Sequence, residues 1–366
     1  MPLTGTLIPI LQRALQQRMQ SLDQSWKLFG LVVFGMDGSR VDLPRTQSNQ
    51  RAYAPSRSAK RKQKTGRGKQ RRPSRQKHAE GPQFWLTTIY HLGLQLPWDW
   101  RSGPSNGSER ADVQELLPTL PDGALLCGDA GFVGYDFARK VLSSGHGLLI
   151  RVGSNVKLLK KLGYVRESAT TVYLWPDKVS SRSEPPLAFR HVTIRGLRHP
   201  IHLIVHLQAG QTLNDKQVAE IYRARWGVEV FYRHFKQTFQ RRKLRSHAAH
   251  NAHIELQWSL VGLWSVLLYA SQELDKQGIP INRLSVAESL RAFRQIARDY
   301  YHPANPRDTL RQRLRRSLID TYNRKQKSSR SYPTKKSKRT TGPPSIKNAT
   351  AQQQELAKKI PLLKYG

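Results

Sequence analysis

The sequence has one cysteine, few acidic residues and no apolar run long enough to cross a membrane. Because Cys127 stands alone, an intramolecular disulfide is impossible and a thiolate zinc site is disfavoured, which fits a reducing cytoplasm. The longest apolar stretch, 258–270, is too short to span a bilayer, and the first residues lack the charged start and apolar core of a signal peptide. We therefore expect a soluble cytoplasmic, nucleoid-associated protein.

The scarcity of acidic residues limits the class of partner. The 366 residues include 62 Lys and Arg against 25 Asp and Glu, a formal net charge of +37. A compact body with this charge repels itself unless a polyanion neutralises it, and nucleic acid is the default polyanion. The basic segments lack the apolar helix face that lies in a bilayer interface, which disfavours a membrane partner. We expect a nucleic-acid partner and no small-molecule substrate, although ribosomal and chromatin-like proteins share this charge.

Apolar patterning predicts an α/β fold, a mixed sheet with helices packed on it. The run KLFGLVVFGM at 27–36 suits a strand buried on both faces, Asp37-Gly38 predicts a turn after it, and 39–43 suits a return strand. The expected organisation is a short N-terminal helix at 1–24, the first part of the core at 25–155 with a disordered basic loop at 55–80, a β-rich insertion at 156–210, the second part of the core at 211–275, C-terminal helices at 276–325 and a basic disordered tail at 326–366.

Four residues of a strongly predicted helix at 215–240 share one face. Tyr222, Arg225, Glu229 and Lys236 are separated by three, four and seven positions, which places them within a ~60° sector at ~100° per residue. This face offers one acid flanked by two cations and a phenol. In the alternative interpretation, an Arg–Glu pair and a later Lys simply occupy a solvated helix face.

Two aspartates follow apolar strands. Asp37 comes directly after 27–36, and Asp129 after the strand at 124–127. Acids at the ends of adjacent buried strands can converge on one point, as the ligands of a hard cation must. In the alternative interpretation each is only a turn former. Asp42 is a rival to Asp37, which we prefer because the strongest apolar strand leads directly into it.

Three segments resemble the IS4 family of bacterial insertion-sequence transposases. YRARWGVEVFYRHFK is similar to the family's Tyr-Arg-Glu-Lys signature, with all four residues at the family's spacing. Asp-Ala-Gly-Phe at 129–132 resembles the second-aspartate motif, in which Gly131 lets the chain turn tightly. MDGSRVDLPRT resembles the first-aspartate region. The resemblance covers roughly residues 25 to 275.

This resemblance implies an RNase H-like fold, with Asp37, Asp129 and Glu229 as its catalytic and metal-binding DDE triad. Oxygen ligands suit Mg²⁺ or Mn²⁺, and two ions would support in-line displacement at phosphorus. The family signature assigns Tyr222, Arg225 and Lys236 to phosphates of the transposon end. The implied reaction is hydrolysis at the ends of the element, followed by transfer of the freed 3′-OH into target DNA. The implied partners are double-stranded DNA, from transposon ends and target, and a second copy of the chain in a homodimer.

Two features depart from the family. Its members carry a sizeable helical domain before the first aspartate, whereas only 36 residues precede Asp37, and the basic run at 57–77 is long for a loop after that strand. We therefore expect a relative that is short at its N-terminus, and a truncated, non-catalytic DNA-binding remnant is the alternative function. In a third hypothesis, the chain is an unrelated basic nucleic-acid-binding protein whose three acids do not meet in space.

Overall fold

The computed structural model describes residues 3–53, 81–176, 183–195, 199–300, 307–319 and 342–362. These residues form one ten-stranded sheet with the order β10-β6-β7-β8-β9-β5-β4-β1-β2-β3. The strands are β1 (Val33–Asp42), β2 (Gln83–His91), β3 (Leu96–Pro104), β4 (Leu125–Gly128), β5 (Gly147–Val152), β6 (Lys157–Lys160), β7 (Thr171–Leu174), β8 (Leu187–Ile194), β9 (Ile201–His206) and β10 (Ser345–Asn348). The basic loop predicted at 55–80 lies outside the described residues.

The half of the sheet from β3 to β5 carries the candidate site. β1 is parallel to β4 and β4 is parallel to β5, while β2 runs antiparallel to both of its neighbours, β1 and β3. The three N-terminal strands therefore form a meander, and helical crossovers connect the parallel strands. The fold is α/β with a mixed sheet flanked by helices, and this order and these directions are those of the predicted RNase H-like fold.

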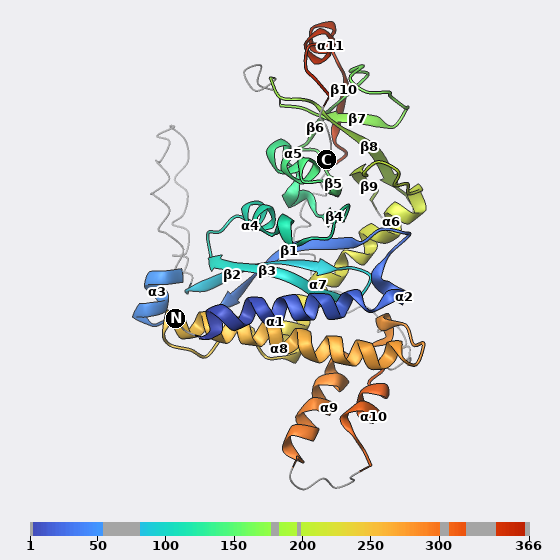
Figure 1. Ribbon diagram of the computed structural model, residues 1–366. Helices are drawn as coiled ribbons and strands as arrows, with labels where there is room; N and C mark the ends of the chain where they lie inside the picture. The colour runs from blue at the N-terminus through green and yellow to red at the C-terminus, as the bar shows by residue number, and fades with distance from the viewer. Residues whose placement is uncertain are drawn as a thin grey trace, which may run out of the picture.

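Helices cover both faces of this half. α1 and α8 lie side by side against one face, α4 and α5 lie on the other, and α9 and α10 extend from α8 away from the sheet (Figure 1). The helices are α1 (Leu3–Gln20), α2 (Asp23–Trp26), α3 (Gln47–Tyr53), α4 (Glu109–Leu116), η1 (Leu117–Thr119), η2 (Ala130–Phe132), α5 (Tyr135–Ser143), α6 (Asp215–Ala224), α7 (Trp226–Arg233), η4 (His234–Thr238), α8 (Ala249–Asp275), η5 (Ile281–Arg283), α9 (Val286–Arg298), α10 (Leu310–Arg315) and α11 (Ala351–Lys358).

The first strand differs from the sequence prediction. Asp37-Gly38 forms no turn, because β1 continues through both residues to Asp42 and pairs with β2 along its whole length, from Phe34–His91 to Asp42–Gln83. A two-residue hairpin turn would require a positive φ, which Gly38 does not adopt. The glycine serves a different purpose, because a Cβ at this position would lie 2.5 Å from Glu109 Oε1.

The C-terminal prediction also needs correction. Residues 326–366 were expected to be a disordered tail, but β10 pairs in parallel with β6 and α11 follows it. Leu162, Tyr173, Trp175 and Ala357 form a small buried cluster beneath this segment. Low apolar content did not exclude order here, because the segment completes an edge of an existing sheet and needs no core of its own. β6 to β9, from the predicted β-rich insertion, continue the same sheet beyond β5.

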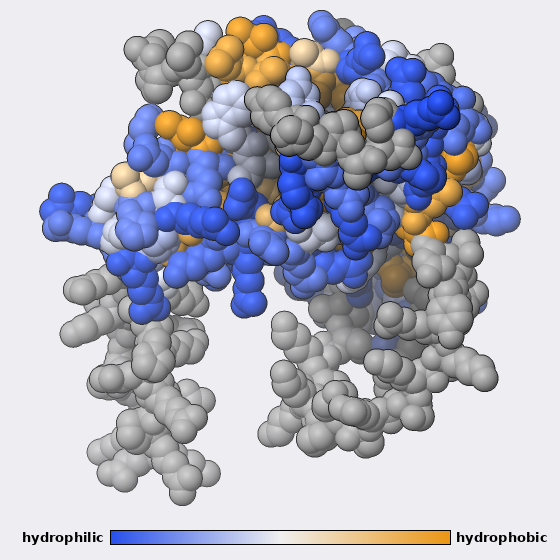
Figure 2. Space-filling view, turned by 90° about the horizontal axis from the view of Figure 1, so that it is seen from below, coloured by the Kyte–Doolittle hydropathy of each residue, from blue (hydrophilic) through white to orange (hydrophobic). Residues whose placement is uncertain are grey.

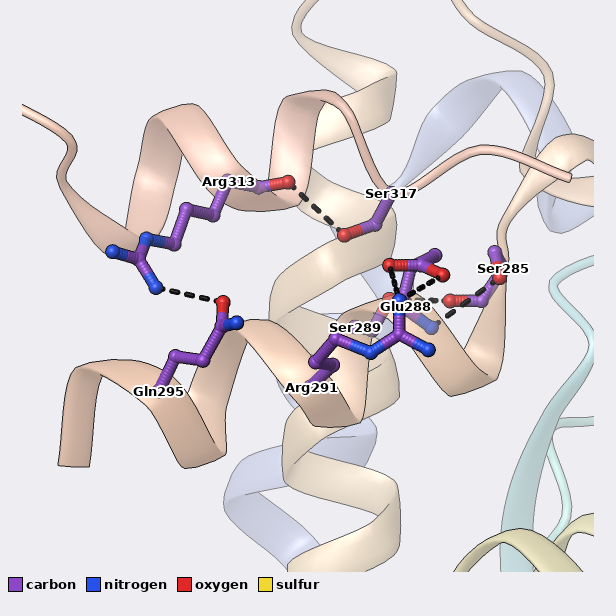
Figure 3. A network of polar contacts seen from close by, with 7 residues as sticks. All are labelled: Ser285, Glu288, Ser289, Arg291, Gln295, Arg313 and Ser317. Atoms are coloured by element: carbon purple, nitrogen blue, oxygen red, sulfur yellow. Dashed lines mark hydrogen bonds and ion pairs between the residues drawn. The ribbon is translucent and has the colours of Figure 1, made fainter. Parts of the chain in front are cut away.

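The apolar stretch at 258–270 is part of α8, whose Trp264 is fully buried. Within the described ranges, no helix has the length and apolar character needed to cross a membrane. The face seen in Figure 2 is mostly hydrophilic, with small separate apolar patches. On the α9–α10 pair, Arg313 donates to Gln295 and Arg291 pairs with Glu288 (Figure 3). Many cations of this pair of helices therefore have partners within the protein.

Candidate active site

Asp37 and Asp129 lie at the same level on neighbouring strands. In the parallel pairing of β1 with β4, Gly35 is opposite Cys127, and each aspartate follows its paired residue by two positions. Adjacent strands lie about 4.8 Å apart, so the two side chains start from neighbouring backbone positions. β4 stops one residue before Asp129, whereas β1 continues. Asp37 therefore marks the place where the β1–β4 pairing ends, although it does not end its own strand.

The segment after β4 fixes Asp129 by short local contacts. The Asp129 carboxylate accepts a hydrogen bond from Gly131 N (2.7 Å), which caps η2. Arg110 donates from Nε and Nη2 to Gly131 O (2.9 and 2.7 Å). A Cβ at position 131 would lie 2.9 Å from Asp129 Oδ1, and the φ of Gly131 is not positive. Glycine is required here for space beside the carboxylate and not, as predicted, for a tight turn.

Three of the four residues of the predicted helix face contact one another. Arg225 Nη2 donates to Glu229 Oε1 (2.9 Å), and the Arg225 guanidinium lies over the Tyr222 ring, 5.6 Å from its centroid. The side chain of Arg225 is 12% exposed and that of Glu229 is 33% exposed. Arg225 Nε is buried and has no hydrogen-bond partner among the described residues. The pair is therefore not an ordinary solvated ion pair, because the cation is largely removed from water.

Lys236 departs from this group because the helix is not regular. α6 and α7 meet at Arg225, and the chain then forms the π-helical turn η4, in which Phe239 N donates to His234 O (2.9 Å). A π-turn holds more residues than an α-turn, so the predicted ~100° per residue fails before Lys236. Lys236 Nζ instead donates to Ser39 Oγ on β1 (2.6 Å).

The charges of the other two predicted acids both act on Asp37. The pKa of Asp37 is raised from 3.8 to about 6, mainly by burial, and the negative charges of Asp129 and Glu229 act in the same direction. The hydrogen bond from Gly38 N and the charge of Arg225 act in the opposite direction. Such an excess of negative charge in a partly buried place is what a bound cation would neutralise.

A fourth carboxylate, Glu109, was missed by sequence reasoning. It begins α4 directly after the N-cap residue Ser108, so its position indicated only a helix start. In the structure it reaches towards the backbone on both sides of the site, near Gly38 and Gly131. Burial, and then the charges of Asp37 and Asp129, raise its pKa to about 7. No local pattern could have found it, because only the packing of α4 brings it beside β1.

Tyr232 was also missed, and it joins α7 to the first strand. Its hydroxyl is 2.8 Å from the carbonyl oxygen of Asp37 and 3.0 Å from that of Leu86, within hydrogen-bonding distance of both. The side chain is 5% exposed. Its position three residues after Glu229 indicated a core residue and nothing more. The contact fixes α7, which carries Glu229, against the backbone of the first aspartate.

The rival aspartate, Asp42, lies at the far end of β1. Its carboxylate accepts a hydrogen bond from Gln83 Nε2 (2.7 Å), and its backbone bonds to Arg242 and Leu244. Five strand positions separate it from Asp37, about 17 Å at ~3.3 Å per residue. It is therefore far from Asp129, and it takes no part in the carboxylate group around Asp37.

The donor chemistry of this group suits a hard divalent cation, since all of its donors are carboxylate oxygens. In the part of the chain that the structure describes, no group of three His, Cys, Asp or Glu side chains lies ready to hold a metal ion. The Glu229 carboxylate is instead paired with the Arg225 guanidinium. The carboxylates fit Mg²⁺ or Mn²⁺ in kind and in charge.

Comparisons with known proteins point to one family. The family model described as "Transposase DDE domain" matches residues 29–264. The chain is 21% identical over 277 residues to "Transposase InsG for insertion sequence element IS4" of Escherichia coli (strain K12), covering 71% of this chain and 57% of that protein. It thus spans less than two thirds of that relative. Among solved structures, it is similar to the piggyBac transposase synaptic complex with hairpin DNA, with a TM-score of 0.43, 12% identity, and coverage of 82% of this chain and 60% of that chain.

Proposed function

Because the chain belongs to the family of transposases with a DDE domain, we propose that it is a DNA transposase. It cleaves the ends of an insertion sequence and joins them to target DNA by metal-dependent phosphoryl transfer. The observation that carries this proposal is the shared electrostatic environment of Asp37, Asp129 and Glu229, three acids from separate elements within the matched residues. Under the rival hypothesis of a basic protein with coincidental acids, these side chains would have no reason to share one electrostatic environment.

We propose that Asp37, Asp129 and Glu229 hold Mg²⁺ or Mn²⁺, as a pair of ions. When bound, the ions would activate the attacking oxygen and neutralise the leaving oxygen. The protein contributes position. The hydrogen bond from Gly131 N orients Asp129, and Tyr232 fixes α7 against β1. Arg225 Nη2 donates to Glu229 Oε1, so a cation at the site would compete with this guanidinium for the carboxylate.

Arg225 and Lys236 are the proposed phosphate contacts beside the acids. An Arg fork can bind two phosphate oxygens, and a Lys supplies a mobile charge. Arg225 has an unpaired buried Nε, and Lys236 reaches across to β1 near Asp37. Tyr222 belongs to the same proposed group, and it acts by supporting the guanidinium of Arg225 through its ring.

The proposed partner is double-stranded DNA, first as the two transposon ends and then as the target. The formal net charge of +37 supports a polyanion such as DNA as the partner. We propose a homodimer in the DNA complex, since one element has two ends to join. Analytical ultracentrifugation of the chain with DNA end fragments would measure this stoichiometry, and one protomer per bridged pair of ends would contradict it.

The deciding experiment is cleavage of DNA that carries the inverted repeats flanking the gene. The wild-type protein should cleave at the repeat ends with Mg²⁺ or Mn²⁺. Glu229→Gln should lower the cleavage rate about 100-fold or more, because a carboxylate that would hold the metal ions at the reacting phosphate is lost. Its affinity for the same DNA, measured by fluorescence anisotropy, should stay close to wild type.

Glu220→Gln, on α6, is the matched control, since it removes one carboxylate from the same helical stretch without touching the acids. It should cleave at the wild-type rate. Cleavage that survives EDTA, or full activity of Glu229→Gln, would refute the proposal. DNA binding by the wild-type protein without any cleavage would identify the non-catalytic remnant instead.

A further inference from the structure

A short basic segment follows the catalytic helix and runs beside the end of β1. It comprises residues 240–245, with the sequence QRRKLR. Gln240 has a φ of 58°, which turns the chain sharply after η4. The segment then bonds to β1 through the backbone of one residue, because Asp42 N donates to Arg242 O (3.0 Å) and Leu244 N donates to Asp42 O (2.9 Å). The chain is thus fixed like a short additional strand.

Side-chain contacts hold the same segment on its inner side. Leu244 is 1% exposed and packs in the main core. Arg241 Nε donates to Ser259 Oγ on α8 (2.9 Å). The backbone N of Arg245 donates to the Glu255 carboxylate, also on α8 (3.0 Å). These contacts use one arginine and one leucine for anchoring, so the remaining side chains project from a backbone that is already ordered.

Those remaining side chains are cations without acidic partners. Arg242, Lys243 and Arg245 are exposed, and no ion pair joins any of them to a carboxylate of the described chain. The α9–α10 pair is different, because Arg311 and Arg315 both pair with the buried Glu273. Cations that stabilise the fold are paired, whereas these three are held in fixed positions and left to solvent.

The three cations continue the charge of the proposed active site. Burial lowers the pKa of Lys236, the charge of Asp42 raises it, and the positive charge of Arg242 lowers it, so Lys236 and Arg242 lie within electrostatic range. Lys236 in turn bonds to β1 two residues after Asp37. The strand then leads from Asp37 to Asp42, about 17 Å at ~3.3 Å per residue. That length equals about five base pairs of duplex DNA at ~3.4 Å each.

We propose that Arg242, Lys243 and Arg245 form a phosphate-binding strip, which holds the DNA duplex about five base pairs from the reacting phosphate. The proposal rests on the proposed function and adds to it the position of the DNA substrate on the protein. The strip contacts phosphates of the DNA backbone, to which Lys and Arg side chains supply positioning contacts. It therefore adds affinity and register without sequence preference.

Salt dependence of DNA binding tests the strip. The full chain is titrated into a labelled duplex of about 40 base pairs at several KCl concentrations, with Ca²⁺ in place of Mg²⁺. Each lost phosphate contact should lower the slope of log K against log salt by ~0.9. R242A/K243A/R245A should therefore lower it by about 3. The control variant removes the same charge from exposed arginines of η5 and α9, which are Arg283, Arg294 and Arg298.

The control should change the slope by less than about 1. Equal changes in both triple variants would overturn the proposal, since charge alone would then explain the binding. Lys243→Arg provides a second comparison, because it keeps the charge and should keep the wild-type slope. All substitutions leave the backbone bonds to Asp42 in place, and circular dichroism should show an unchanged fold.

Ethylation interference on a repeat-end fragment locates the contact. Ethylated phosphates about five base pairs from the cleavage position should block binding by wild type but not by the strip variant. The same blocked positions in both proteins would contradict the placement. Failure of the proposed function is separable, because Glu229→Gln retains the strip. Loss of metal-dependent cleavage with a wild-type salt slope concerns the acids, whereas a changed slope with unchanged chemistry concerns the strip.

Discussion

Asp37→Asn should make the metal-free protein more stable at alkaline pH. Burial and the neighbouring acids raise the pKa of Asp37 from 3.8 to about 6 in the folded chain. The folded state therefore binds this proton more tightly than the unfolded state does. Its stabilising contribution is complete below about pH 3.8 and is lost as the pH rises through about 6. At pH 8 the ionised carboxylate destabilises the folded state. Asparagine removes this negative charge and keeps an oxygen that accepts the hydrogen bond from Gly38 N.

The size of this effect follows from the shift. A difference of about 2 pKa units corresponds to ~3 kcal/mol, at ~1.36 kcal/mol per unit. Asp37 is partly exposed, so solvent screening reduces the expected gain to about 1–3 kcal/mol. In a chain of this size that equals a rise in Tm of a few degrees. Near pH 3 the wild-type side chain is protonated in both the folded and the unfolded chain, and the two proteins should melt at nearly the same temperature.

Thermal unfolding with EDTA at about pH 3 and pH 8 measures the difference, and repeating it with Mn²⁺ at pH 8 adds the metal. Asp122→Asn, an exposed acid outside the site, is the control and should show no pH-dependent gain. Mn²⁺ should raise the Tm of wild type at pH 8 more than that of Asp37→Asn. A variant that is less stable than wild type at pH 8 without metal, or equally stabilised by Mn²⁺, would refute the reasoning.

Three further substitutions test the supports of the site and of the fold. Tyr232→Phe loses the bond to the Asp37 carbonyl and should cost about 1–2 kcal/mol in urea unfolding, with a fall in kcat that exceeds any change in DNA affinity. Gly131→Ala crowds the Asp129 carboxylate and should weaken Mn²⁺ binding about 10-fold by calorimetry with an unchanged Tm. Glu273→Ala removes the fully buried acid that pairs α8 with α10 and should cost about 2 kcal/mol. Amide exchange should then speed up in α9 and α10, and unchanged protection there would contradict the last assignment.

The fold could be predicted where one strong pattern determined each element. The mixed sheet with helices packed on it and the helical stretch at 215–240 follow from apolar periodicity. Apolar periodicity did not predict the local structure where pairing with a neighbouring strand determined it. Asp37-Gly38 is a strong local turn signal, but pairing with β2 keeps it extended. β10 has too little apolar character to predict a strand, and it forms because β6 offers an open edge.

The candidate site divides in the same way. Arg225 and Glu229 could be placed together because they are four positions apart at the start of α7 and their charges attract. Lys236 lies within the π-turn η4, which no periodicity indicated, so its partner on β1 could not be foreseen. Asp37 and Asp129 were paired on the premise that both end their strands. The premise was wrong for Asp37, yet the parallel register of β1 with β4 still brings the two residues to one level.

The glycines of the site show why Glu109 could not be predicted from a sequence motif. A side chain at Gly38 would collide with the Glu109 carboxylate, and one at Gly131 would crowd Asp129. Each glycine therefore makes room for an acid that is distant in sequence or two residues away, and neither is needed for backbone conformation. From the sequence alone such a glycine indicates a turn, because glycine is the usual residue where the backbone needs a positive φ. The spatial requirement becomes visible only when α4 is packed against β1, and it ties the small residues next to Asp37 and Asp129 to the same crowded group of carboxylates.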